Sequence, residues 1–210
     1  MSVITPADQD TKPVVGIHGS ADVARRVLRL AGWAEDAVRF SEYDVMDPFV
    51  GLRAGEQHVM VVKYAVREPD LVVSLPLIED ARAVLVGAHH PLAQRESVTL
   101  EDVAGYPAFQ CPENFPADVW NQVVPPQTRA GRPIHRVHPM TTLARMTEIL
   151  TTTQAVHVSF ASLDAVLPEQ VKVIPVRDLL PAPVALCWLR TAPLPAAAAK
   201  LVADAEAGLR

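Results

Sequence analysis

Apolar and polar residues follow two different periods along this chain, and the changes of period predict its strands and helices. In the first third, apolar runs of strand length occur at residues 13–19, 38–45 and 58–63. After the first run, Ser20 can cap a helix with apolar residues at helical spacing, and Gly32 ends that helix. After the second, Asp47 as cap, Pro48 at the first helical position and Gly55 beyond the end bracket a shorter helix. This order predicts a parallel sheet covered by helices.

A second set of the same pattern follows. Strands are predicted at residues 71–77 and 81–86, and Thr99 and Asp102 then have the spacing of a capping box that opens a helix. Further strands are predicted at 107–111, 134–137, 156–160, 171–176 and 184–189, and further helices at 117–123, from 141 or 142 to 150, at 162–166 and at 195–209. The chain therefore builds a second α/β unit and has a strand and a helix with which to return to the first.

These two sets predict an α/β fold with two Rossmann-like lobes joined by two crossover strands, at 83–86 and near 176–186. The predicted organisation is a flexible leader at 1–12, lobe I at 13–84 plus 186–210, and lobe II at 85–185. Clefts between lobes commonly hold small ligands, and helix N-termini at strand ends supply N–H donors for a carboxylate. We therefore expect an anionic small molecule to bind between the lobes.

Composition and charge argue against several classes of function. The chain has 210 residues, 50% of them hydrophobic, and a net charge of −5 with scattered Lys and Arg. Direct nucleic-acid binding is therefore not expected. No apolar run reaches the roughly 18 residues of a membrane span, and the first twelve residues lack the features of a secretory signal. Cys111 and Cys187 lie far apart in apolar runs, which favours reduced thiols and a cytoplasmic protein without a membrane partner.

The histidines and cysteines do not form a metal-binding pattern. His89 and His90 are adjacent, whereas His135 and His138 are three apart on a predicted strand, so their side chains leave opposite faces. The sequence has no HExxH or CxxC pattern, no GxGxxG or phosphate-binding loop and no nucleophile elbow. No metal and no cofactor are predicted.

Three stretches carry a resemblance to a known family: LRAGEQHVMVV (52–62), EPDL (68–71) and AHHPLAQRESVTLEDVAGYP (88–107). They resemble the effector-binding domain of LysR-type transcriptional regulators, which has the type 2 periplasmic-binding-protein fold. The resemblance spans roughly residues 13–209, and weaker support comes from 139–150, 156–166 and the final strand and helix. It implies ligand binding, transcription regulation and a dimer.

Two departures from the family pattern stand beside this resemblance. The helix-turn-helix and linker helix that usually precede the domain have no counterpart, so we expect a free-standing sensing module; an excised domain is the alternative. In addition, Gln57 and His58 stand where the family usually has an acidic residue before the strand.

In lobe I, the resemblance places the anionic end of a ligand at His18, Gly19 and Ser20. Ser20 would offer its hydroxyl, although it can also simply cap the helix. His18 could donate a hydrogen bond or act as a base, and the simpler interpretation is a partnered residue at a strand end. Lys63 and Tyr64 close the third strand and would add a positive charge and a hydroxyl; a solvated Lys63 is the alternative.

In lobe II, the strand ends that correspond carry Cys111, Thr141, Thr142, Ser159 and Phe160. Thr141 or Thr142 opens a helix and would add hydroxyl and amide donors for an anion. Phe160 would form an apolar wall, with packing in the core as the preferred alternative. Cys111 is more simply a buried thiol than a nucleophile, because a nucleophile needs a neighbouring base and a stabilised thiolate.

Three functions follow as hypotheses. The first is a sensor of a carboxylate-bearing metabolite, acting as a homodimer or paired with a related regulator. The second is an enzyme with lyase or cyclase chemistry, as in chorismate dehydratase and porphobilinogen deaminase, for which His18, Tyr64, Cys111 or Glu113 would supply the acid, base or nucleophile. The third is a protein-binding partner of an intact regulator.

Overall fold

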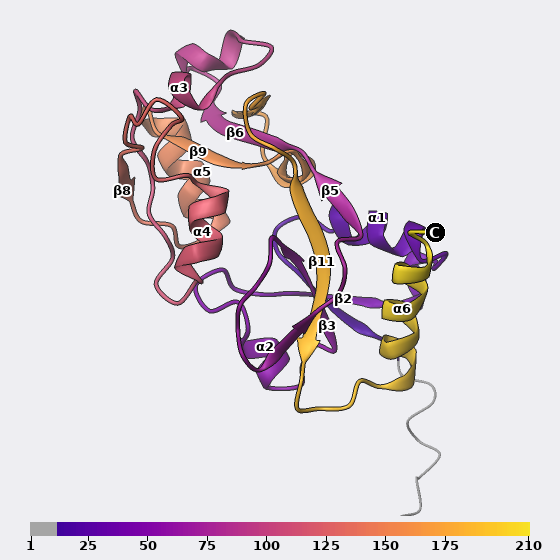
Figure 1. The fold of residues 1–210 in the computed structure, drawn as a ribbon. Coiled ribbons are helices and arrows are strands. Elements are labelled where there is room, and N and C mark those ends of the chain that lie inside the picture. The colour runs from indigo at the N-terminus through magenta and orange to yellow at the C-terminus, as the bar shows by residue number, and fades with distance from the viewer. Residues whose placement is uncertain (1–11) are drawn as a thin grey trace, which may run out of the picture. The chain divides into compact units, whose positions relative to one another are not determined.

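The computed structural model describes residues 12–210, and these divide into two compact units. Unit 1 comprises the described part of Met1–Tyr43 together with Phe49–Ile78 and Pro183–Arg210, and unit 2 comprises Asp44–Pro48 and Glu79–Ala182. The leader predicted at 1–12 falls, apart from Lys12, outside the described residues. Both units contain a sheet and helices, which confirms the predicted α/β class (Figure 1).

The sheet of unit 1 has the strand order β2-β1-β3-β11-β4, with β5 also paired to β11. Its strands are β1 (Val14–Ile17), β2 (Arg39–Glu42), β3 (Val59–Lys63), β4 (Leu71–Val73), β5 (Ile78–Asp80) and β11 (Ala182–Leu189). β1 pairs in parallel with β2 and β3, whereas β11 runs antiparallel to β3 and β4. The predicted parallel core is therefore confirmed, with an antiparallel return strand beside it.

Two apolar clusters cover the two faces of this sheet, because successive residues of a strand point to opposite sides. On one face, Val59 and Val61 pack with α1 (Asp22–Leu30) and α6 (Ala196–Ala207). These two helices lie side by side (Figure 1). On the other face, Met60 and Val62 pack with Leu52 of α2 (Val50–Arg53). A short 3-10 helix, Glu35–Ala37, precedes β2.

The starts of the first two helices differ from the predictions. α2 begins at Val50 with Phe49 before it, so Asp47 is not its cap and Pro48 is not its first residue. These two residues lie instead in a turn that also holds Asp44, whose Oδ1 accepts the Met46 N–H at 2.9 Å. α1 likewise begins one residue later than expected, because Ala21 occupies the cap position. Local hydrogen bonding by Asp44 forms the turn and delays the helix.

The sheet of unit 2 has the order β10-β6-β9-β7-β8. Its strands are β6 (Arg82–Gly87), β7 (Ala108–Phe109), β8 (Arg136–His138), β9 (Val156–Phe160) and β10 (Val171–Pro175). β7 is parallel to β8 and β9, and β6 is antiparallel to β9 and β10. The helices are α3 (Leu100–Val103), α4 (Ala117–Val123) and α5 (Leu143–Thr152), with 3-10 turns at Pro91–Gln94 and Ala161–Val166.

Several predicted boundaries in unit 2 match the structure. The ranges 117–123 and 156–160 coincide with α4 and β9, while the predicted helix at 162–166 is a 3-10 turn. The predicted divisions between lobes, at 84/85 and 185/186, lie inside β6 and β11, whereas the units divide at 78/79 and 182/183. β6 pairs with β9 from Arg82 onward, which ties its first residues to the unit 2 sheet. No helix in residues 12–210 is long and apolar enough to cross a membrane.

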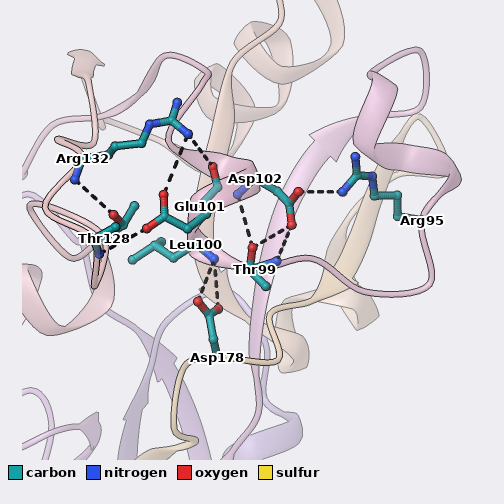
Figure 2. A network of polar contacts seen from close by, with 9 residues as sticks. Arg95, Thr99, Leu100, Glu101, Asp102, Thr128, Arg132 and Asp178 are labelled. Carbon is teal, nitrogen blue, oxygen red and sulfur yellow. Dashed lines mark hydrogen bonds and ion pairs between the residues drawn. The ribbon is translucent and has the colours of Figure 1, made fainter.

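The predicted capping box at α3 is present and extends into a polar network (Figure 2). Thr99 and Asp102 exchange hydrogen bonds, and Asp102 Oδ1 pairs with Arg95 Nη1 at 2.7 Å. Asp178, which follows β10, accepts the Leu100 N–H at 2.9 and 3.2 Å from its two carboxylate oxygens. Two segments far apart in sequence therefore satisfy the first amides of one short helix.

Candidate functional site

The predicted site residues of unit 1 close or follow two neighbouring parallel strands of its sheet. The carboxyl ends of β1 and β3 meet at one edge of the sheet because the two strands are parallel, with Gly16 paired to Met60. Beyond this pair, β1 ends at Ile17 and β3 at Lys63. His18, Gly19 and Ser20 follow β1 in the chain, and Tyr64 follows Lys63, so the grouping predicted for unit 1 agrees with this strand order and stays a prediction.

Ser20 is buried at this edge, with 6% of its surface exposed. Its Oγ accepts the Asp22 N–H at 3.1 Å, and its own N–H donates to the His18 carbonyl at 2.9 Å. A hydroxyl that accepts one hydrogen bond still has its proton to donate. Ser20 thus supports the start of α1 without being the cap, and it keeps a donor suited to an anion.

His18 is exposed and packs beside Tyr43, with ring centroids 5.3 Å apart. Its Nδ1 lies 3.2 Å from the Tyr43 carbonyl oxygen. A carbonyl oxygen can only accept a hydrogen bond, so in this contact Nδ1 of His18 carries the proton and donates it. The simpler of the two interpretations of His18, a partnered residue at a strand end, agrees with this geometry.

The predicted residues of unit 2 also lie at the carboxyl ends of parallel strands. β7, β8 and β9 end at the same edge of the sheet. Cys111 follows β7, Thr141 and Thr142 follow β8, and Ser159 and Phe160 are the last two residues of β9. Thr142 is the cap of α5, since its Oγ1 accepts the Arg145 N–H at 3.1 Å. Ser159 and Phe160 are 3% and 8% exposed, so packing in the core accounts for most of their surface.

The comparisons with known proteins decide the family. Residues 37–209 match the LysR substrate binding domain. The chain belongs to this family. The predicted resemblance and the periplasmic-binding-protein-like fold are thereby confirmed.

Solved structures show the same fold at low sequence identity. The effector binding domain of QuiR in complex with shikimate is 16% identical, with a TM-score of 0.66 over 94% of this chain and 96% of that one. The BenM effector binding domain with its effector benzoate is 17% identical, with a TM-score of 0.63 over 93% and 90%. Full-length CbnR complexed with its target DNA is 14% identical, with a TM-score of 0.69 over 94% and 70%. No curated protein sequence matches the chain.

In this LysR substrate-binding domain, Arg82 is a residue of the unit 2 edge that the sequence analysis missed. It begins β6 opposite Phe160, and only 4% of its surface is exposed. Its guanidinium lies 5.1 Å from the Phe160 ring centroid and donates to the Ser159 carbonyl at 3.0 Å. It also donates to the carbonyls that end α4, those of Gln122 at 3.1 Å and Val123. The available signal was a charged residue directly before the apolar run AVLV.

Cys111 has the environment of a structural thiol. It is half-buried, and its Sγ lies 3.6 Å from the Phe115 carbonyl. Desolvation raises the pKa of the Cys111 thiol, and the charge of Arg136 only partly opposes this. Because the reactive form of cysteine is the thiolate, the raised pKa argues against Cys111 as a nucleophile. Glu113, the other catalytic candidate nearby in sequence, is exposed.

His89 and His90 face different partners. His90 is 1% exposed, accepts the Leu92 N–H at Nδ1 and packs edge-on against Tyr106 at 4.3 Å. Desolvation lowers the pKa of His90, because burial penalises the charged ring. His89 instead places Nε2 2.9 Å from the Thr153 carbonyl. Among residues 12–210, no three histidine, cysteine or acidic side chains are grouped so that they could hold a metal ion.

Proposed function

We propose that this protein binds a small carboxylate-bearing molecule and acts as a sensing module. The observation that supports the proposal is the parallel pairing of β1 and β3, because a buried serine follows the first strand in the chain, and a lysine and a tyrosine close the second. Family membership supports it, since QuiR and BenM are described with shikimate and benzoate, both carboxylates. The chain's own ligand is proposed to share that chemistry.

The chemistry of the unit 1 edge suits an anion. Ser20 has a hydroxyl proton to donate, Lys63 carries a positive charge, and α1 opens at Asp22, close to Ser20 in the chain, with the positive end of its dipole. Asp22 in the first turn of α1 is acidic and reduces the positive potential at the start of the helix. The Ser20 hydroxyl and Lys63 therefore contribute most of the attraction for an anion. In unit 2, Thr141 and Thr142 at the start of α5 and the ring of Phe160 are the proposed contacts.

Titration calorimetry and thermal melting against a panel of aromatic and alicyclic carboxylates test this proposal. At least one member should release or absorb heat and raise the melting temperature, because a ligand that binds only the folded state stabilises it. Ser20→Ala and Lys63→Met should each lower the affinity for that carboxylate. Lys200→Met on α6 is the control, because it removes an equal charge away from the edge and should leave the affinity unchanged. A panel without any binder, or edge variants that bind as the Lys200→Met variant does, would contradict the proposal.

We propose further that the protein works in the cytoplasm, makes no direct contact with nucleic acid, and pairs with a second copy or a related regulator. Two free cysteines, one of them fully buried, support a reducing compartment. Light scattering after size exclusion, alone and with a purified LysR-type regulator, tests the pairing; a strict monomer that captures no regulator would refute it. The observed Cys111 environment gives no support to the enzymatic alternative.

A further inference from the structure

Tyr64 has a backbone conformation that is rare for its residue type. Within residues 12–210 it is the one non-glycine residue with a positive φ, at 67°. In this left-handed region the Cβ of an L-residue crowds the following carbonyl, which is why glycine usually occupies such positions. A β-carbon with an aromatic ring is therefore strained where the chain leaves β3.

The same edge of the sheet shows what the backbone alone requires. Gly19, at the exit of the neighbouring strand β1, has a φ of 68°, almost equal to that of Tyr64. Two parallel strands thus leave one edge through the same conformation, and one exit has glycine where the other has tyrosine. Glycine would satisfy the turn after β3, so the turn does not explain the tyrosine side chain.

The conformation of Tyr64 is held by the sheet. Lys63 pairs with Val184 of β11, and the next N–H along the chain, that of Tyr64, donates to the Pro183 carbonyl at 2.9 Å. This hydrogen bond fixes the peptide group that precedes Tyr64. The side chain is only half-buried, so part of it lies at the molecular surface beside Lys63. Strained residues that the surrounding structure holds in place are concentrated at ligand sites.

We propose that Tyr64 is the specificity-determining residue of the unit 1 edge, and that it selects a carboxylate built on a ring. This inference rests on the function proposed above. The carboxylate is held by Ser20 and Lys63, while the Tyr64 ring packs on the ring of the ligand and its phenol hydroxyl hydrogen-bonds a polar substituent. An acyclic carboxylate gains no contact from Tyr64 and binds more weakly.

The test compares Tyr64→Gly with wild type, and Ala65→Gly is the matched control, because it adds the same backbone freedom at a neighbour without a positive φ. Benzoate and shikimate are the cyclic probes, with acetate and succinate as acyclic ones. Tyr64→Gly should raise the melting temperature without ligand by roughly 2–4 °C, whereas Ala65→Gly should lower it. The affinity of Tyr64→Gly for the better cyclic probe should fall by roughly tenfold.

The outcomes separate this inference from the proposed function. If no carboxylate of the panel binds wild type, the proposed function fails and the role of Tyr64 fails with it. If wild type binds a cyclic probe and Tyr64→Gly binds it equally well, only the role of Tyr64 is overturned. A melting temperature of Tyr64→Gly below that of wild type also overturns it, because the side chain would then be kept for packing. Loss of affinity together with an equal or higher melting temperature supports it.

Discussion

The side chain of Gln57 lies between two glycines, and this arrangement predicts a coupling that can be measured. Gln57 is 4% exposed, and its carboxamide fills the space that a Cβ would need at Gly16 of β1 and at Gly51 of α2. An alanine Cβ at Gly16 would lie 2.5 Å from Gln57 Oε1, and one at Gly51 would lie 2.9 Å from Gln57 Cδ. Gly16→Ala should therefore destabilise the protein only while the carboxamide is present.

The magnitude follows from two opposing effects. Forcing an extra methyl into a filled space costs about 1–3 kcal/mol, and replacing glycine by alanine at an unstrained φ returns about 0.4–1 kcal/mol. Without the carboxamide, the nearest remaining neighbour of the new Cβ is the flexible Met60 Cγ, at 3.2 Å. Gly16→Ala should thus lower the free energy of unfolding by about 1–2 kcal/mol in wild type and leave it almost unchanged in Gln57→Ala. The coupling energy should be about 1–2 kcal/mol.

Urea unfolding of wild type, both single variants and the double variant measures this coupling, and Gly51→Ala repeats the test from the opposite side of the carboxamide. Gly105→Ala is the matched control, because a Cβ there would lie 3.9 Å from Arg132 Nη2, an ordinary van der Waals contact; this substitution should not destabilise the protein. Equal losses for Gly16→Ala with and without Gln57 would refute the reasoning, since the clash would then lie with backbone or with Met60.

Three further predictions concern single groups. Asp102 has a lowered pKa, first because the Thr99 N–H and hydroxyl hydrogen-bond it. Asp102→Asn should therefore lower the free energy of unfolding by roughly 1 kcal/mol at neutral pH. The stability that comes from a depressed carboxyl pKa is lost as the pH falls through the pKa of the folded state, so the difference from wild type should close below about pH 4. A difference that stays constant from pH 7 to pH 2 would contradict this. Cys187 is fully buried with a pKa raised to about 12 by desolvation, so iodoacetamide at neutral pH should modify Cys111 slowly and Cys187 only after unfolding, as mass spectrometry would show. Arg53, bound to two acidic side chains but 41% exposed, should contribute only about 0.5–1 kcal/mol; Arg53→Met should unfold at lower urea concentration, and high salt should reduce the difference.

Where the residues interact locally, the sequence by itself determined the structure. The capping box of Thr99 and Asp102 and the start of α5 at Thr142 are present because their hydrogen bonds join residues three apart. The turn before α2 shows the limit of such inference. Asp47 and Pro48 have the residue types of a helix start, yet the Asp44 side chain forms a competing turn that delays the helix to Val50.

The motifs that carry the family resemblance are explained by contacts between them. Arg53, in the stretch 52–62, binds Glu68 and Asp70 of EPDL at 2.7 and 2.8 Å. Gln57 and His58, which depart from the family pattern, both have partners in unit 1: Gln57 fits between Gly16 and Gly51, and His58 Nδ1 accepts the Val14 N–H at 3.0 Å. The sequence shows these residues, but their pairing depends on the sheet register.

The candidate site divides in the same way. Strand order and alternation were sufficient to predict that β1 and β3 are parallel neighbours whose carboxyl ends meet, and the grouping of His18, Ser20, Lys63 and Tyr64 there stays a prediction. Only the tertiary structure showed the buried guanidinium of Arg82 at the unit 2 edge, since its partners come from β9 and α4, 77 and about 40 residues away respectively. It also showed that Tyr64 has a left-handed backbone, which no local pattern predicts, at the point where its N–H is hydrogen-bonded to Pro183 of β11.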